Sequence, residues 1–97
     1  MDISTSANVV TIKGNIKTVS DYQEIKSAID ALVGVHSNIV VVIPDSISIT
    51  SSVIGYFTKL VQKEKIDLSI KVGDPDLMEL FDDLGLVSLF KVQKASL

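Results

Sequence analysis

The chain has 97 residues, a length typical of one small domain. Hydrophobic residues make up 46% and charged residues 22%, a balance that predicts a folded chain and excludes a disordered one. The net charge of -3, without a basic cluster, argues against nucleic-acid binding. The absence of cysteine excludes disulfides, thiolate metal sites and a cysteine nucleophile.

The N-terminal residues lack the basic region and the apolar core of a secretory signal peptide. No apolar stretch of the sequence approaches the length that crosses a bilayer. We therefore expect a cytoplasmic protein without membrane insertion.

The first third of the chain predicts a strand and a helix. Residues 1–7 hold at most a brief edge strand, whereas Val9 to Ile12 is a β-branched run that indicates a strand. Ser20 with Gln23 three residues later fits a capping box, so a helix is expected to begin there and to end at Gly34. The apolar face of this helix consists of Ile25, Ala28, Ile29, Leu32 and Val33.

The middle of the chain predicts a central strand, a polar loop and a second helix. Ile39 to Ile43 is wholly apolar, which predicts a strand covered on both faces, and Pro44 ends it. Asp45 to Ser52 is too rich in hydroxyls to belong to the core. The second helical stripe follows as Val53, Ile54, Phe57, Leu60 and Val61.

The last third predicts a strand, a helix and a final strand. Residues 68–72 alternate apolar and polar, which indicates a strand with one solvated face. Asp74 and Pro75 form a helix start, and Gly85 marks the helix end. Its apolar stripe is Leu77, Leu80, Phe81 and Leu84. Val87 to Val92 is expected to form the last strand, and Lys94 to Leu97 a frayed tail.

This alternation of strand and helix predicts one α/β domain over residues 1–97, with a mostly parallel sheet of four to five strands. Polar residues at Lys13, Ser69, Lys71 and Lys91 indicate that one face of the outer strands is not covered. The helices are therefore expected mainly on the other face.

Candidate catalytic residues are few. His36 is the only histidine and follows a helix end in a polar loop, a position typical of a surface residue. Asp82 and Asp83 are adjacent, so they point to different parts of a helix surface and make a poor acid/base pair. No nucleophile elbow, phosphate-binding glycine loop or metal-ligand spacing occurs. We expect no enzymatic activity, no metal and no cofactor.

A hydroxyl cluster, Thr50, Ser51 and Ser52, lies between the central strand and the second helix. These residues are typical helix caps, because their oxygens accept hydrogen bonds from free amides. They are also candidates for phosphorylation, since a phosphoserine in a first helical turn is stabilised by the helix dipole. Residue chemistry leaves both interpretations open.

A docking surface is expected beside this cluster. Tyr56 and Lys59 are predicted on the outer side of the second helix, together with Gln62 and Lys63. Ile47 and Ile49, in the loop before the helix, either add an apolar docking patch or pack under the loop as minor core.

From Val9 to Val92 the chain resembles the STAS domain family, the anti-sigma factor antagonists and their relatives. Residues 50–55, Thr-Ser-Ser-Val-Ile-Gly after an apolar strand, are similar to the family signature Asp-Ser-Ser-Gly-Leu-Gly. Residues 72–75 lead into Leu80-Phe81 and Leu84-Gly85-Leu86, and Leu89-Phe90 follows, as in these domains.

The resemblance implies a bacterial signal-transduction domain that regulates transcription by partner switching and is not an enzyme. Ser51 matches the serine that is phosphorylated, with Thr50 and Ser52 as alternatives. The implied partners are an anti-sigma factor with serine kinase activity and a phosphatase. The expected partner-binding residues are Ile47, Ile49, Thr50, Ser52, Val53, Tyr56 and Lys59.

Two positions depart from the family pattern, and both lie in the signature. Thr50 replaces an aspartate and Val53 replaces a glycine, changes that bear on kinase recognition. The alternatives are an interaction or scaffold module that is never phosphorylated, with a homodimer through the solvated sheet face, and a small-ligand or anion-binding domain at the same helix start.

Overall fold

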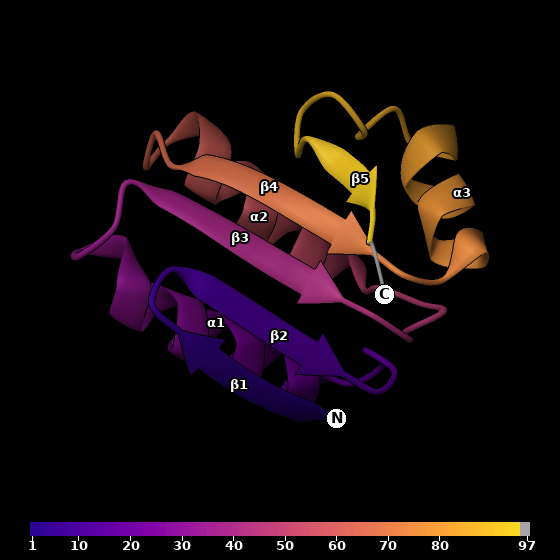
Figure 1. Cartoon of the computed structure of the whole chain (residues 1–97), viewed down its shortest axis with the longest axis horizontal. Helices are drawn as coiled ribbons and strands as arrows, with labels where there is room; N and C mark the ends of the chain where they lie inside the picture. The colour runs from indigo at the N-terminus through magenta and orange to yellow at the C-terminus, as the bar shows by residue number, and fades with distance from the viewer. Residues whose placement is uncertain (96–97) are drawn as a thin grey trace.

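The expected alternation of strands and helices is present in the computed structural model, which describes residues 1–95 (Figure 1). The class, a small α/β domain, is confirmed. The elements in chain order are β1 (Asp2–Ser6), β2 (Val9–Lys13), α1 (Val19–Val33), β3 (Asn38–Ile43), α2 (Ser51–Gln62), β4 (Asp67–Val72), α3 (Pro75–Asp83) and β5 (Val92–Lys94).

The five strands form one sheet in the order β1-β2-β3-β4-β5. Strands β2 to β5 pair in parallel, because helices connect β2 to β3 and β3 to β4, and α3 precedes β5. The first strand pairs antiparallel with β2, since the turn at Ala7 and Asn8 is too short for any other arrangement. The sheet is therefore mixed, and the expectation of a mostly parallel sheet is corrected.

The two faces of the sheet differ. Figure 1 shows α1 and α2 behind the sheet and α3 beside β4 and β5. Along β3 the side chains of Ile39, Val41 and Ile43 are fully buried on the helix side. Val40 and Val42 alternate with them and are only half-buried, so the predicted cover on both faces of this strand is wrong. The run is apolar because a central strand favours β-branched residues, even on its open face.

Three phenylalanines join α2, α3 and the segment before β5. Phe90 meets Phe57 edge-on with ring centroids 5.9 Å apart, and it meets Phe81 at 6.2 Å in the same geometry. All three rings are fully buried. Such edge-to-face pairs add to the stabilisation from apolar burial.

Phe90 also explains why the predicted strand from Val87 to Val92 is wrong. Residues 87–91 form turns, the amide of Phe90 donates to the carbonyl of Leu86 over 3.0 Å, and β5 begins only at Val92. The coiled backbone directs the Phe90 ring inward, and Lys91 adopts a positive φ of 48° before the strand starts.

The C-terminal end of the chain is more ordered than expected. Lys94 is the last residue of β5, and the Ala95 amide donates to the carbonyl of Val72 over 2.8 Å. The prediction of a frayed tail is therefore wrong for these two residues, and its remainder, residues 96–97, lies outside the described part. Leu84, expected in the apolar stripe of α3, is 50% exposed because the helix ends at Asp83.

The first helix begins before the predicted capping box. Thr18 is the N-cap, its Oγ1 accepts from the Asp21 amide over 3.0 Å, and the Asp21 carboxylate accepts from the Thr18 amide over 3.1 Å. The same carboxylate also accepts from the Lys17 amide over 2.9 Å. These backbone hydrogen bonds lower the pKa of Asp21, and a charged acceptor outcompetes the neutral pair Ser20 and Gln23.

Candidate functional site

The hydroxyl cluster lies at the carboxyl end of the central strand. β3 ends at Ile43 in the middle of the sheet, and residues 44–50 lead from it into α2. Loops beyond the carboxyl ends of parallel strands are the usual position of binding sites in α/β domains. The hydroxyl cluster thus lies between the central strand and the second helix, as the sequence predicted.

Thr50 is the N-cap of α2. Its Oγ1 accepts a hydrogen bond from the Val53 amide over 3.2 Å, and its backbone carbonyl accepts from the Ile54 amide over 3.1 Å. Thr50 therefore caps the first turn of α2 through its side chain. Because its hydroxyl is engaged and half-buried, Thr50 is the least available phosphate acceptor of the three.

Ser51 and Ser52 occupy the first two helical positions, and both are exposed. The first turn of α2 contains no acidic residue, whereas the first turns of α1 and α3 contain Asp21 and Asp76. The positive end of the α2 dipole is therefore not balanced by a carboxylate. A phosphate on either serine would be placed where a helix best stabilises negative charge.

Hydrogen bonds to the loop after β2 hold the segment before α2 in place. Ser46 is fully buried, its Oγ accepts from the Ile16 amide over 3.1 Å, and it donates to the Ser48 carbonyl over 2.7 Å. Ser48 Oγ donates to the Ile16 carbonyl over 2.8 Å, and the Ile47 amide donates to Asn15 Oδ1 over 3.0 Å. The hydroxyl-rich composition pointed to a polar loop but did not distinguish these structural serines from exposed ones.

This fixed loop presents one of the two predicted apolar residues. The side chain of Ile47 is 54% exposed, whereas Ile49 is half-buried and packs against the core. On α2, the exposed residues Ser51, Gly55 and Lys59 recur every fourth position and share one face of the helix. Ile47 and this face of the helix are the candidate docking surface, called here the α2 surface.

Two residues expected on the docking surface lie in the core instead. Val53 is fully buried, and Tyr56 is only 5% exposed. Val53 follows the helix period toward the sheet with Phe57, so its side chain does not cover the open backbone of the α2 surface. Gly55, which was not among the expected partner-binding residues, leaves open space around the helix because it has no side chain.

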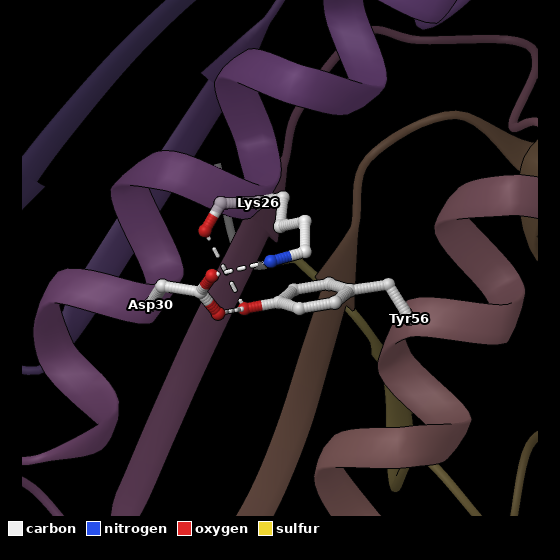
Figure 2. Close-up of polar contacts among 3 residues, drawn as sticks. All are labelled: Lys26, Asp30 and Tyr56. Atoms are coloured by element: carbon white, nitrogen blue, oxygen red, sulfur yellow. Dashed lines mark hydrogen bonds and ion pairs between the residues drawn. The ribbon is translucent and has the colours of Figure 1, made fainter.

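Tyr56 instead ties α2 to α1. Its hydroxyl donates to the Asp30 carboxylate, with the oxygens 2.5 Å apart, and the ammonium of Lys26 pairs with the same carboxylate over 2.7 Å (Figure 2). The Lys26 ammonium lies 5.7 Å from the centre of the Tyr56 ring, within the range of a cation–π contact. Lys26 and Asp30 come from α1, so this cluster fixes the spacing of the two helices.

The ionisation states in this cluster follow from its geometry. Burial and the hydrogen bond to Asp30 raise the pKa of Tyr56 far above its usual value, so the phenol stays protonated. Partial burial opposes ionisation of Asp30, but the hydrogen bonds from Lys26 and Tyr56 prevail and lower its pKa. The cluster is therefore a neutral phenol donating to an ion pair, which is a structural arrangement.

The other polar candidates are scattered. His36 is half-buried after α1, and Asp82 and Asp83 are exposed on α3, far along the chain from the α2 surface. Within residues 1–95, no three histidine or acidic side chains gather in a way that could hold a metal ion. In the same range, no helix combines the length and apolar character needed to cross a membrane.

Comparisons with known proteins found a similarity of fold alone. No protein-family model matches the chain, and no curated protein matches it in sequence. The structure is similar to the NMR structure of the protein TM1081, with a TM-score of 0.66 and 14% sequence identity. The match covers 96% of this chain and 79% of the other. At this identity the likeness concerns the α/β architecture alone.

Proposed function

We propose that the chain is a non-enzymatic, STAS-type regulatory domain that binds a protein partner through the α2 surface and is released by phosphorylation of Ser51. The partner is an anti-sigma factor with serine kinase activity, and a phosphatase resets the domain in the cytoplasm. The observation that carries the proposal is the exposed Ser51 at an N-terminal turn of α2 that contains no carboxylate.

Geometry supports Ser51 and Ser52 over Thr50 as the modified residue. The Thr50 hydroxyl is half-buried and already accepts a hydrogen bond from the Val53 amide, so it is less accessible to a kinase. Ser51 and Ser52 are both exposed, and Ser51 is the residue that matches the family serine. Ser52 is therefore the alternative acceptor.

The α2 surface is suited to docking because it combines an exposed apolar side chain with an open stretch of helix backbone. Ile47 offers an exposed apolar side chain on a loop that is already fixed, so little conformational entropy is lost on binding. Gly55 lets a partner approach the helix backbone. A phosphate of about −2 charge next to these residues would weaken an apolar contact by repulsion and desolvation.

Phosphosite mass spectrometry on protein purified from its native host is the direct test. We expect phosphate on Ser51. Phosphate found only on Ser52 would assign the switch to that residue. If no phosphate is found under several growth conditions, a scaffold module that is never phosphorylated is favoured.

Binding to candidate serine kinases of the same organism tests the switch itself. Ser51→Ala should bind like the unmodified domain, and Ser51→Asp should bind at least about tenfold more weakly. Ser88→Asp, which adds the same charge at an exposed serine in the turns before β5, is the matched control. Equal binding by Ser51→Ala and Ser51→Asp would contradict the proposal.

A further inference from the structure

The two edges of the sheet are protected differently. β5 has only three residues, ends in Lys94 and follows Lys91, and such short edges with lysines discourage pairing with another chain. β1 has five residues, contains neither lysine nor proline, and borders the sheet with no further strand beside it in the described part of the chain (Figure 1). The backbone of β1 is therefore open to an additional strand.

The register of β1 shows which of its backbone groups point outward. The two-residue turn after Ser6 makes Ser6 and Val9 a hydrogen-bonded pair, and such pairs alternate with non-bonded ones along an antiparallel ladder. Ser4 is then bonded to β2, whereas the N–H and C=O groups of Ile3 and Thr5 point away from β2. These two residues carry the outward backbone groups of the edge.

The helix layer covers β1 only in part. A groove of about 690 Å³ lies between β1 and α1. The side chains of Ile3 and Thr5 are on the helix side of the sheet, because their partners in β2, Ile12 and Val10, are fully buried there. Ile3 is nevertheless only half-buried and Thr5 is exposed. Beyond α1 there is therefore space for more structure on the helix side of this edge.

The side of α1 that borders the groove differs from the side that faces α2. Lys26 and Asp30 are turned toward α2, where both contact Tyr56. The residues of α1 that line the groove are small or neutral with one exception: Glu24, Ser27, Ala28, Ala31 and Leu32. A solvated helix face usually carries charged side chains, whereas exposed small residues such as Ser27 and Ala31 let another helix approach closely.

A second copy of the chain fits the open strand and the small helix face at once. α1 contacts both β1 and β2, so its axis lies near their midline. Because neighbouring strands are about 4.8 Å apart, pairing of two β1 strands about a two-fold axis would place the two α1 axes roughly 10 Å apart. Packed helices have axes about 8–10 Å apart. A lone peptide strand would pair with the edge but leave the α1 face uncovered.

The outward groups of β1 are also self-complementary. Antiparallel pairing about Ser4 sets Ile3 of each copy opposite Thr5 of the other, so every outward group of the strand gains a partner. In the neighbouring registers one of these residues would face Met1 or Ala7, which lie outside the strand. Pairing about Ser4 therefore matches the two strands over their full length.

We infer that two copies of the chain associate through the β1 edge and the adjoining face of α1. The strands pair antiparallel about Ser4, and the two α1 helices pack against each other through Ser27 and Ala31. The two five-stranded sheets join into one continuous sheet, an isologous two-fold contact. The contact uses the edge of the sheet and not its solvated face. It does not rest on the proposed switch, because α2 takes no part in it.

Cysteine cross-linking tests the register, because the native chain contains no cysteine. Pairing about Ser4 places the two Ser4 residues in a non-bonded pair with Cα atoms about 4.5 Å apart, which suits a disulfide. Ser6 is the matched control, since it is exposed on the same face but would lie about 14 Å from its copy. In a glutathione redox buffer, Ser4→Cys should form the linked dimer at least about tenfold faster than Ser6→Cys. Equal rates would overturn the inference.

Sedimentation of the chain without cysteines tests the strand contact. We expect a dimer whose population rises with concentration. Thr5→Pro removes the outward N–H of Thr5 and leaves the hydrogen bonds to β2 in place, so dimer affinity should fall at least about tenfold. Thr5→Val keeps that N–H and should dimerise within about twofold of the native chain. A native chain that stays monomeric up to about 1 mM would overturn the inference.

A variant on α1 tests the helix contact and covers the case in which Thr5→Pro disturbs the fold. Ala31→Glu places a charged side chain at the two-fold contact of the helices and should also weaken the dimer at least about tenfold. Gln62→Glu adds the same charge at an exposed position of α2 and should leave the dimer unchanged. A dimer that persists in both Thr5→Pro and Ala31→Glu would assign the contact to another surface and overturn the inference.

Discussion

The backbone of Gly73, where β4 ends, lies so close to Pro44, where β3 ends, that a Cβ on Gly73 would overlap the Pro44 carbonyl oxygen. The Gly73 amide also donates to the Ile43 carbonyl over 2.9 Å. The two crossover loops at the carboxyl edge of the sheet are therefore in direct backbone contact, and only glycine fits at this position.

Gly73→Ala should consequently destabilise the domain by roughly 2–3 kcal/mol, because the backbone must shift to relieve the overlap. Gly55→Ala is the matched control. It places the same methyl group in open space on a helix and should stabilise the domain by about 1 kcal/mol. Urea unfolding of both variants measures the difference. A Gly73→Ala variant as stable as the native chain would contradict the close contact.

Removing the cap of α2 should cost stability. Thr50→Ala loses the hydrogen bond from the Val53 amide, and we expect a loss of about 1 kcal/mol in urea unfolding. Thr50→Asp keeps a side-chain acceptor and adds a negative charge at the helix start, so its stability should equal or exceed that of the native chain. A Thr50→Asp variant as unstable as Thr50→Ala would show that the cap is not the cause.

An acidic residue at the start of α2 should stabilise the isolated domain. Ser51→Asp places a carboxylate in a first turn that contains no acidic residue, so a gain of about 0.5 kcal/mol is expected at low salt and a smaller gain at high salt. Gln62→Asp, at the other end of the same helix, should have the opposite sign. Thermal unfolding at two salt concentrations distinguishes this dipole effect from a general effect of charge.

The contact between α1 and α2 should depend on pH. Because the pKa of Asp30 is lowered in the folded chain, its stabilisation is complete above the pKa of an unfolded aspartate, about 3.9, and is lost as the pH falls through the lower folded value. Tyr56→Phe removes one of the hydrogen bonds that lower this pKa. We expect that variant to lose about 1 kcal/mol at neutral pH.

A urea-unfolding series from neutral to acidic pH checks this prediction. The difference in stability between the native chain and Tyr56→Phe should shrink as the pH falls through the folded pKa of Asp30. Asp21, whose pKa is also lowered, contributes equally to both proteins and cancels in the difference. A difference that stays constant with pH would mean that the Tyr56 hydroxyl does not stabilise the Asp30 carboxylate.

Local patterns in the sequence predicted most of the fold. The apolar spacing gave the three helices, and Asp74 with Pro75 gave the start of α3 correctly, because both signals act through nearby backbone atoms. Composition could not reveal that one face of β3 is open, since Val40 and Val42 resemble core residues in every respect. The position of Phe90 likewise depends on the rings of Phe57 and Phe81, which are distant in sequence. A local strand pattern could not predict these contacts.

The sequence predicted where the hydroxyl cluster lies in the fold, but not which of the neighbouring side chains are exposed. Ser51 and Lys59 are exposed as expected, because each lies on the polar side of a helix. For Ile47 the sequence left both exposure and burial open, and the structure exposes it. Tyr56 was expected at the surface because its hydroxyl is polar. The sequence could not show that Asp30 on another helix accepts a hydrogen bond from this hydroxyl and allows the ring to be buried. Partners that lie far apart in sequence decide burial for amphipathic side chains of this kind.

The order of the strands in the sheet repeats their order along the chain. Each new strand can therefore add to the edge left by the one before it, after a single hairpin or crossover has closed. The entropic cost of chain closure is therefore smaller than in a sheet whose neighbouring strands lie further apart in sequence. The sheet can grow strand by strand as the chain leaves the ribosome, and β5, the shortest strand, completes it last.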